Sequence, residues 1–193
     1  MTNGDQLDEP AVREVVFNMA SILTTTGYAS ADYTLWGSLA VALIFCAGMI
    51  GGCSGSTSSG PKIFRYQILV SMVASEIRRL TSSNAVAIEH YQGRLMTPEV
   101  LSSVAAFFMM FFLTLGVSSV LLVLLGLPPI TAISGAAACL SNIGPGLGPE
   151  IGPAGNFAGL PGPAKWLMAM LMLVGRLELL TVYVLFLPAF WRT

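Results

Sequence analysis

Residues 130–148 read ITAISGAAACLSNIGPGLG, and this stretch decides the fold. Its first part, 130–141, is small and apolar, and as an α-helix it would extend only about 18 Å. A helix of that length cannot cross a hydrocarbon core of about 30 Å. The glycines and the proline that follow are poor helix formers. The stretch therefore predicts a half-helix at membrane depth that ends in an irregular loop.

A second unit of the same kind lies near the N-terminus, where residues 11–27 read AVREVVFNMASILTTTG. Its apolar residues recur at helical spacing over 11–23, which is about 20 Å of helix, and a threonine run and Gly27 follow. Alone, this unit is also typical of an amphipathic surface helix followed by a turn. Two such units favour a pore, because irregular backbone at membrane depth is tolerated only where it is buried in protein or lines water.

The composition indicates a membrane protein. The 193 residues are 54% hydrophobic and 10% charged, whereas soluble domains carry about 25% charged residues. The net charge of −1 excludes a nucleic-acid-binding protein, and the three cysteines lack metal or redox spacing and exclude a disulfide-stapled domain. Three longer apolar stretches, 34–53, 100–126 and 165–190, are predicted to be spanning helices.

The basic residues predict the orientation. Five of the nine Lys and Arg residues lie in 62–99, which the positive-inside rule places in the cytoplasm, with an interfacial helix expected over 62–80. Residues 1–30 and 142–164 then lie outside. The predicted fold is an all-α membrane protein of span–pore helix–span repeats, with an incomplete third repeat at 1–61, a cytoplasmic connector at 62–99 and a complete fourth repeat at 100–193.

Several motifs together resemble the Trk/Ktr/HKT superfamily of bacterial potassium-uptake proteins, and the TrkH branch in particular. SILTTTGYASADYTLW (21–36) is similar to the third filter segment of that family, and GGCSGSTSSGPKIFR (51–65) to its interrupted helix and gating loop. SNIGPGLG (141–148) and KWLMAMLMLVGRLELLTVYVLFLPAFW (165–191) resemble the fourth filter and the last helix. The resemblance implies four repeats around one pore. This chain would hold the fourth repeat and all but the first helix of the third, as a truncated or partial subunit.

Two loops are the candidate selectivity filter. Extended loops with glycine turn backbone carbonyls toward a dehydrated cation, and the C-terminal end of a half-helix adds a partial negative charge. With the resemblance, Gly27 and Gly144 correspond to the one filter glycine of each repeat. We expect K⁺ at Thr26, Gly27, Ile143 and Gly144. The full set of predicted filter residues is Thr25, Thr26, Gly27, Asn142, Ile143 and Gly144.

The glycine- and serine-rich loop 51–60 allows two interpretations. As a phosphate-binding loop it fails, because Lys62 follows Gly60 by two residues and no Ser or Thr comes after it. In the resembled family this loop lies under the filter and obstructs the pore until a cytoplasmic regulator moves it. The predicted gating residues are Gly51, Gly52, Ser54, Gly55, Ser56, Thr57 and Arg176.

Arg176 and Glu178 are predicted to lie within the last spanning helix, where ionisable groups are costly and face a cavity or a partner. Two residues of helix separate them by about 200°, so we do not expect them to pair with each other. Arg176 either ties helices together by bonding loop carbonyls, or lines the pore beneath the filter and holds the gating loop.

The predicted function is potassium uptake through a filter-lined pore of the bacterial cytoplasmic membrane, in which this multi-pass chain is a partial subunit. The resemblance implies K⁺ as the transported ion, no organic cofactor in this chain, the remaining repeats as partners, a homodimer in membrane lipid, and a cytoplasmic nucleotide-binding regulatory subunit. The alternatives are a sodium-dependent or sodium-conducting transporter of the same superfamily, and a non-transporting membrane assembly subunit. An enzyme is not expected, because no catalytic dyad, triad or metal set is visible.

Overall fold

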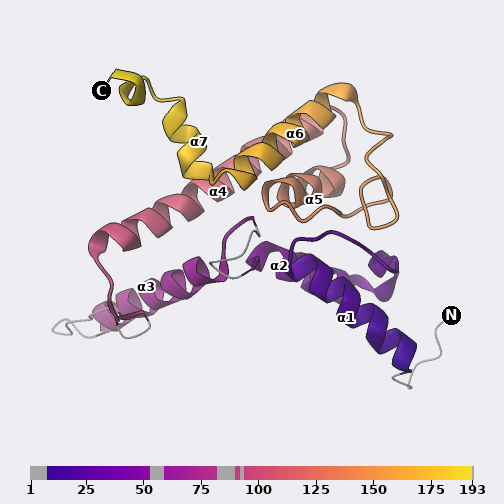
Figure 1. Cartoon of the computed structure of the whole chain (residues 1–193), viewed down its shortest axis with the longest axis horizontal. Coiled ribbons are helices and arrows are strands. Elements are labelled where there is room, and N and C mark those ends of the chain that lie inside the picture. The colour runs from indigo at the N-terminus through magenta and orange to yellow at the C-terminus, as the bar shows by residue number, and fades with distance from the viewer. Residues whose placement is uncertain (1–7, 53–58, 82–89, 92–93, 193) are drawn as a thin grey trace.

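The computed structural model describes residues 8–52, 59–81, 90–91 and 94–192 (Figure 1). Their fold is helical apart from one antiparallel hairpin of two-residue strands, which confirms the predicted all-α class. The elements are α1 (Glu9–Leu23), η1 (Tyr33–Trp36), α2 (Ser38–Ile50), α3 (Ile63–Thr81), β1 (His90–Tyr91), β2 (Arg94–Leu95), α4 (Pro98–Leu124), α5 (Pro129–Leu140), α6 (Gly162–Arg176), α7 (Leu179–Leu185) and η2 (Pro188–Arg192).

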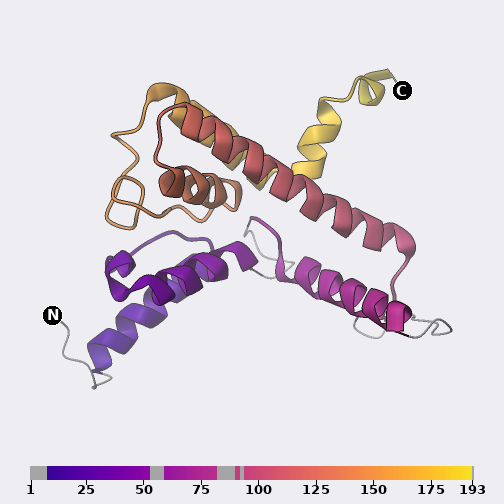
Figure 2. The same ribbon diagram turned by 180° about the vertical axis from the view of Figure 1, so that it is seen from behind.

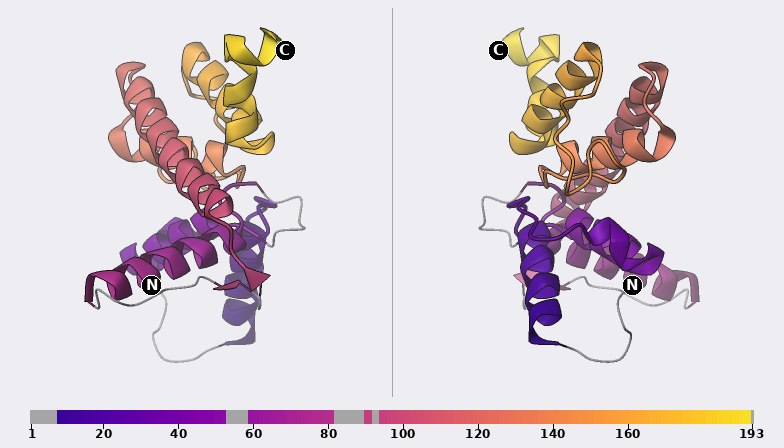
Figure 3. Two further views of the ribbon diagram at one scale, coloured as in Figure 1. Left: turned by 90° about the vertical axis from the view of Figure 1, so that its left-hand side faces the viewer. Right: turned by 90° about the vertical axis from the view of Figure 1, so that its right-hand side faces the viewer.

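The short helix α5 is enclosed by longer helices. It packs against both α4 and α6, which overlap along one diagonal in Figures 1 and 2 and diverge like the arms of a V in Figure 3. Nine of the twelve residues of α5 are buried, because alanine, serine and glycine let the neighbouring backbones approach closely. Phe111, Leu140, Met168 and Leu171 are among the residues that form the core between these helices.

The helices α1 and α2 form a second, smaller unit with η1 (Figure 1). Its buried core consists of Ile22, Tyr33 and Ile44, together with Ile143 from the other unit. Burial, and secondly the negative charge of Asp32, raises the pKa of Tyr33 to about 12. The phenol therefore stays neutral and serves as a packing residue here.

The structure contains one continuous helix that is long and apolar enough to cross a membrane, Glu99–Leu124, among the residues it describes. The last predicted span is not continuous. It consists of α6 and α7, which together are long and apolar enough but bend by 106° at the break between them. The physical reason is Glu178, whose φ of 62° lies in the left-handed region that a right-handed helix cannot contain. The expectation of a continuous helix over 165–190 is therefore wrong.

The span predicted at 34–53 is also shorter than expected. The helix α2 has thirteen residues, or about 20 Å, and is bounded by Gly37 with a φ of 99° and Gly51 with a φ of 73°. Both glycines adopt backbone conformations outside the helical region. The apolar run is therefore divided into a 3₁₀ turn, a short helix and the start of the loop at 51–60.

The helix α3 runs alongside the first half of α4 (Figures 1 and 2). Tyr66 of α3 packs edge-on against Phe108, with ring centroids 5.0 Å apart, and its hydroxyl donates to the Met49 carbonyl at 2.9 Å. Phe108 is about 15 Å along α4 from its first residue, so α3 begins beside the middle of the spanning helix. The assignment of 62–99 to a cytoplasmic connector stays a prediction.

Candidate filter and gating site

The loops after α1 and α5 leave their helices with one and the same hydrogen-bond pattern. In both, the first, second and third residues after the helix donate their N–H groups to carbonyls four, three and five residues back. Such bonds satisfy carbonyl groups that the end of a helix leaves unpaired. The pairs are Thr24–Ala20, Thr25–Ile22 and Thr26–Ser21 after α1, and Ser141–Ala137, Asn142–Cys139 and Ile143–Ala138 after α5, at 2.8 to 3.1 Å.

The backbone of the two loops also matches residue by residue. Thr25 and Asn142 have φ values of 54° and 53°, and Gly27 and Gly144 have φ values of 80° and 113°. A left-handed residue followed two positions later by a left-handed glycine turns the chain away from the helix axis. The two predicted filter segments are therefore copies of one backbone motif, although glycine is the only residue type they share at matched positions from 25 to 27.

The two loops meet directly. A Cβ atom on Gly27 would lie 2.4 Å from the Ile143 carbonyl oxygen, and one on Gly144 would lie 3.3 Å from the Gly27 Cα atom. No side chain therefore separates the loops at this point. The structure brings three of the predicted filter residues, Gly27, Ile143 and Gly144, into one contact.

The side chains next to this contact point in different directions. The Asn142 amide donates to the Met172 carbonyl in α6 at 3.0 Å. The Ile143 side chain packs in the core of the α1–α2 unit, so closely that a Cβ atom on Gly48 would lie 2.8 Å from its Cδ1 atom. In the other loop, the Thr24 and Thr26 hydroxyls are 2.8 Å apart and hydrogen-bond to each other.

Each loop is tied to its own half-helix by a polar side chain that the sequence reasoning missed. Asn18 of α1, which is fully buried, accepts a hydrogen bond from the Ser30 N–H at 3.1 Å. Ser134 of α5 accepts one from the Leu147 N–H at 2.9 Å. Ser30 and Leu147 each lie three residues after the filter glycine. The signal that points to these residues is an uncharged polar side chain within a local apolar run, VFNMA in α1 and AISGA in α5.

The structure describes the predicted gating loop at its two ends. Gly51 ends α2, and the Gly52 carbonyl accepts a hydrogen bond from the Ile63 N–H at 3.2 Å, which draws the start of α3 back to the end of α2. The predicted gating residues Ser54, Gly55, Ser56 and Thr57 lie outside the described residues. The role predicted for them stays a prediction.

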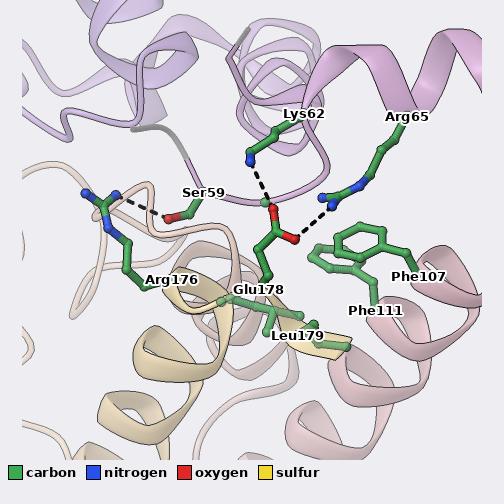
Figure 4. A pocket seen from close by; sticks show the side chains of 11 residues that line it. Ser59, Lys62, Arg65, Phe107, Phe111, Arg176, Glu178 and Leu179 are labelled. Carbon is green, nitrogen blue, oxygen red and sulfur yellow. Dashed lines mark hydrogen bonds and ion pairs between the residues drawn. The ribbon is translucent and has the colours of Figure 1, made fainter. Parts of the chain in front are cut away.

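Arg176 reaches the described end of this loop. It is the last residue of α6, and its guanidinium donates to the Ser59 hydroxyl at 3.3 Å (Figure 4). Both residues line a cavity of about 260 Å³ between the loop, α4 and the α6–α7 break. The structure thus joins Arg176 to the segment that the sequence predicts to be the gating loop.

Glu178 is bonded to two cations at the start of α3. Lys62 donates to one of its carboxylate oxygens at 2.9 Å and Arg65 to the other at 3.2 Å (Figure 4). The Lys62 and Arg65 side chains are only 22% and 13% exposed, and the Arg65 guanidinium also lies 4.0 Å from the centre of the Phe107 ring. The sequence did not predict this cluster. It ties the break in the last helix to the start of α3.

The contact between the two loops is made by backbone groups and not by metal-binding side chains. Among the described residues, no three His, Cys, Asp or Glu side chains are placed to hold a metal ion. The donors available to a cation at the contact of the two loops are backbone carbonyl oxygens, which are the ligands of potassium filters.

The family model described as a cation transport protein, TrkH, matches residues 6–193. The chain belongs to the TrkH family. Trk system potassium uptake protein TrkI of Halomonas elongata is 49% identical over 182 residues, and TrkH of Escherichia coli is 35% identical over 181 residues. The crystal structure of the potassium transporter TrkH from Vibrio parahaemolyticus superposes with a TM-score of 0.86 at 34% identity and covers 95% of this chain.

These TrkH-family relatives are much longer than this chain. The aligned part is 94% of this chain but only 37% of the TrkI and Escherichia coli TrkH sequences, and 38% of the Vibrio parahaemolyticus structure. Both curated relatives are named as potassium uptake proteins. The family model confirms the family predicted from the sequence, and the superposition on the crystal structure confirms the predicted all-α repeat architecture.

Proposed function

We propose that this chain supplies two of the four filter loops of a potassium-uptake pore in the bacterial cytoplasmic membrane. The observation that carries the proposal is the direct contact of two loops with the same backbone conformation, at Gly27 and Ile143. Each loop follows a half-helix, and the negative end of that helix dipole faces the loop. Backbone carbonyls at Thr26, Gly27, Ile143 and Gly144 are the proposed K⁺ ligands.

The remaining repeats of a longer subunit are the proposed partners of this chain. An apolar groove of about 530 Å³ lies between α1 and α2, and Val15, Met19 and Leu43 contribute to its lining. Val15 and Leu43 are 44% and 59% exposed, whereas nine of the twelve residues of α5, the equivalent of α1, are buried. A further apolar helix beside α1 would complete the third repeat in the same way.

The loop between Gly51 and Lys62 is the proposed gate. The Arg176–Ser59 hydrogen bond and the Glu178 cluster supply two points at which the last helix holds that loop. We propose that a cytoplasmic nucleotide-binding regulatory subunit shifts this arrangement, and that the complete protein is a multi-pass homodimer. The relatives named as Trk system proteins support potassium as the transported ion.

A chimera tests the proposal. The chain replaces the corresponding 182 residues of Halomonas elongata TrkI, and the chimera is expressed in a bacterial strain without its own potassium uptake. We expect growth at low external K⁺ and uptake of Rb⁺ as a tracer, with unmodified TrkI as the positive control. A chimera that is present in the membrane but supports neither growth at low K⁺ nor Rb⁺ uptake would overturn the proposal. Tracer uptake of Na⁺ in place of Rb⁺ would favour the sodium-conducting alternative.

A further inference from the structure

The second filter loop is held from two sides by neighbouring side chains. Asn142 bonds to the Met172 carbonyl of α6, and the Ile143 side chain is buried among residues of α1 and α2. The Ile143 carbonyl follows both attachments along the chain and lies against Gly27. The position of that carbonyl is therefore restricted by the Asn142 and Ile143 side chains that precede it.

The Asn142 attachment lies at a close contact between α5 and α6. A Cβ atom on Gly175 of α6 would lie 2.0 Å from the Leu140 carbonyl oxygen and 2.9 Å from the Asn142 amide nitrogen. The backbone of α6 thus touches the end of α5 at Leu140 and the amide of Asn142. Asparagine suits this place because it tolerates the left-handed conformation and also carries an N–H₂ donor.

We infer that Asn142 is a positioning residue that sets the discrimination between K⁺ and Na⁺ in this filter loop. Its side chain points to α6, so it acts through the Ile143 carbonyl and is not itself an ion ligand. The inference rests on the proposed function and deepens it. Selectivity depends on how carbonyl oxygens replace the hydration shell of the ion, and a loop released on one side presents them less uniformly.

Two variants in the TrkI chimera test the inference. Asn142→Gly keeps the left-handed conformation accessible and removes the amide, and Asn142→Asp keeps the shape but removes the N–H₂ donor. Loss of one hydrogen bond corresponds to a change of about two- to tenfold in an equilibrium ratio. We expect the K⁺/Na⁺ permeability ratio to fall by about that factor in proteoliposomes, while Rb⁺ flux is retained.

The matched control is Asn156→Ala. The Asn156 side chain accepts a hydrogen bond from the Ala158 N–H and has no part in the Asn142–Met172 bond. This variant should leave the permeability ratio unchanged. If either Asn142 variant inserts and conducts with an unchanged K⁺/Na⁺ permeability ratio, the inference is wrong and the proposed function is unaffected. An unmodified chimera without K⁺ flux would overturn the proposed function, and the inference with it.

Discussion

The carbonyl oxygen of Ile143 takes up the space that a side chain on Gly27 would need, at 2.4 Å from the position of its Cβ atom. Gly27 and Ile143 belong to different repeats, so the fit of one repeat against the other is fixed at the level of the backbone. This contact makes glycine necessary at position 27 for two separate reasons, its φ of 80° and the neighbouring carbonyl.

Gly27→Ala should abolish potassium uptake. A left-handed alanine costs about 1–2 kcal/mol, and the methyl group also forces the Ile143 carbonyl to move. The control is Gly126→Ala, because Gly126 has a φ of 95° but no atom near its would-be Cβ position. Growth at low K⁺ separates the two variants in the TrkI chimera. Equal growth of both would show that the carbonyl contact is unimportant.

Gly175→Ala should destabilise the protein despite its place in a helix. Alanine is favoured over glycine within helices by about 1 kcal/mol, but here its methyl group would lie 2.0 Å from the Leu140 carbonyl oxygen. Gly116 of α4 is also helical and has open space around it. We therefore expect a lower melting temperature for Gly175→Ala and an equal or higher one for Gly116→Ala in detergent. The reverse order would contradict the close α5–α6 contact.

Glu178→Gln should weaken the attachment of α3 to the last helix. The variant keeps the shape of the side chain and removes the charge that Lys62 and Arg65 share. Because both cations are largely buried, we expect a loss of about 1–2 kcal/mol, between the values for exposed and buried ion pairs.

A double-mutant cycle measures this attachment. Glu178→Gln and Lys62→Met, singly and combined, should give a coupling energy above about 0.5 kcal/mol in the thermal stability of the protein. The exposed pair Glu9–Arg13 is the control, and its Glu9→Gln variant should change stability by less than about 0.5 kcal/mol. Additive effects of the Glu178 and Lys62 variants would disprove the coupling.

Ser134→Ala should loosen the loop that follows the second filter segment. The Ser134 hydroxyl is buried, accepts from the Leu147 N–H at 2.9 Å and donates to the Ile130 carbonyl at 2.7 Å. Its loss should cost about 1–2 kcal/mol in the free energy of unfolding and raise amide hydrogen exchange at Leu147. Ser102→Ala, which removes an exposed hydroxyl bonded within α4, should change neither quantity. Unaltered exchange at Leu147 would refute the anchoring role.

The sequence predicts the two half-helices and the irregular loops after them well. The half-helices expected at 11–23 and 130–141 correspond to α1 and α5, and both are followed by the predicted irregular loops. Their length and their glycines are local properties, which is why periodicity and composition reveal them. The same local signals did not show that the two loops touch, since that contact depends on how the repeats pack.

The break at Glu178 is a case that local signals miss. Residues 165–190 read as one apolar helix, and nothing in the pattern marks a non-glycine residue with a positive φ. The conformation is maintained by packing and by two cations that lie 113 and 116 residues earlier in the chain. Long-range pairing of this kind has no periodic signature, so the Lys62–Arg65–Glu178 cluster could not be derived from spacing.

The same cluster has a consequence for biosynthesis. Lys62 and Arg65 leave the ribosome 116 and 113 residues before Glu178, so they are made long before their carboxylate exists. A largely buried cation without a counter-charge is costly. The contact of Lys62 and Arg65 with Glu178 can therefore form only after α6 and the residues that follow it have been synthesised. Folding at this cluster is completed late, when the carboxylate neutralises a helix that was made earlier.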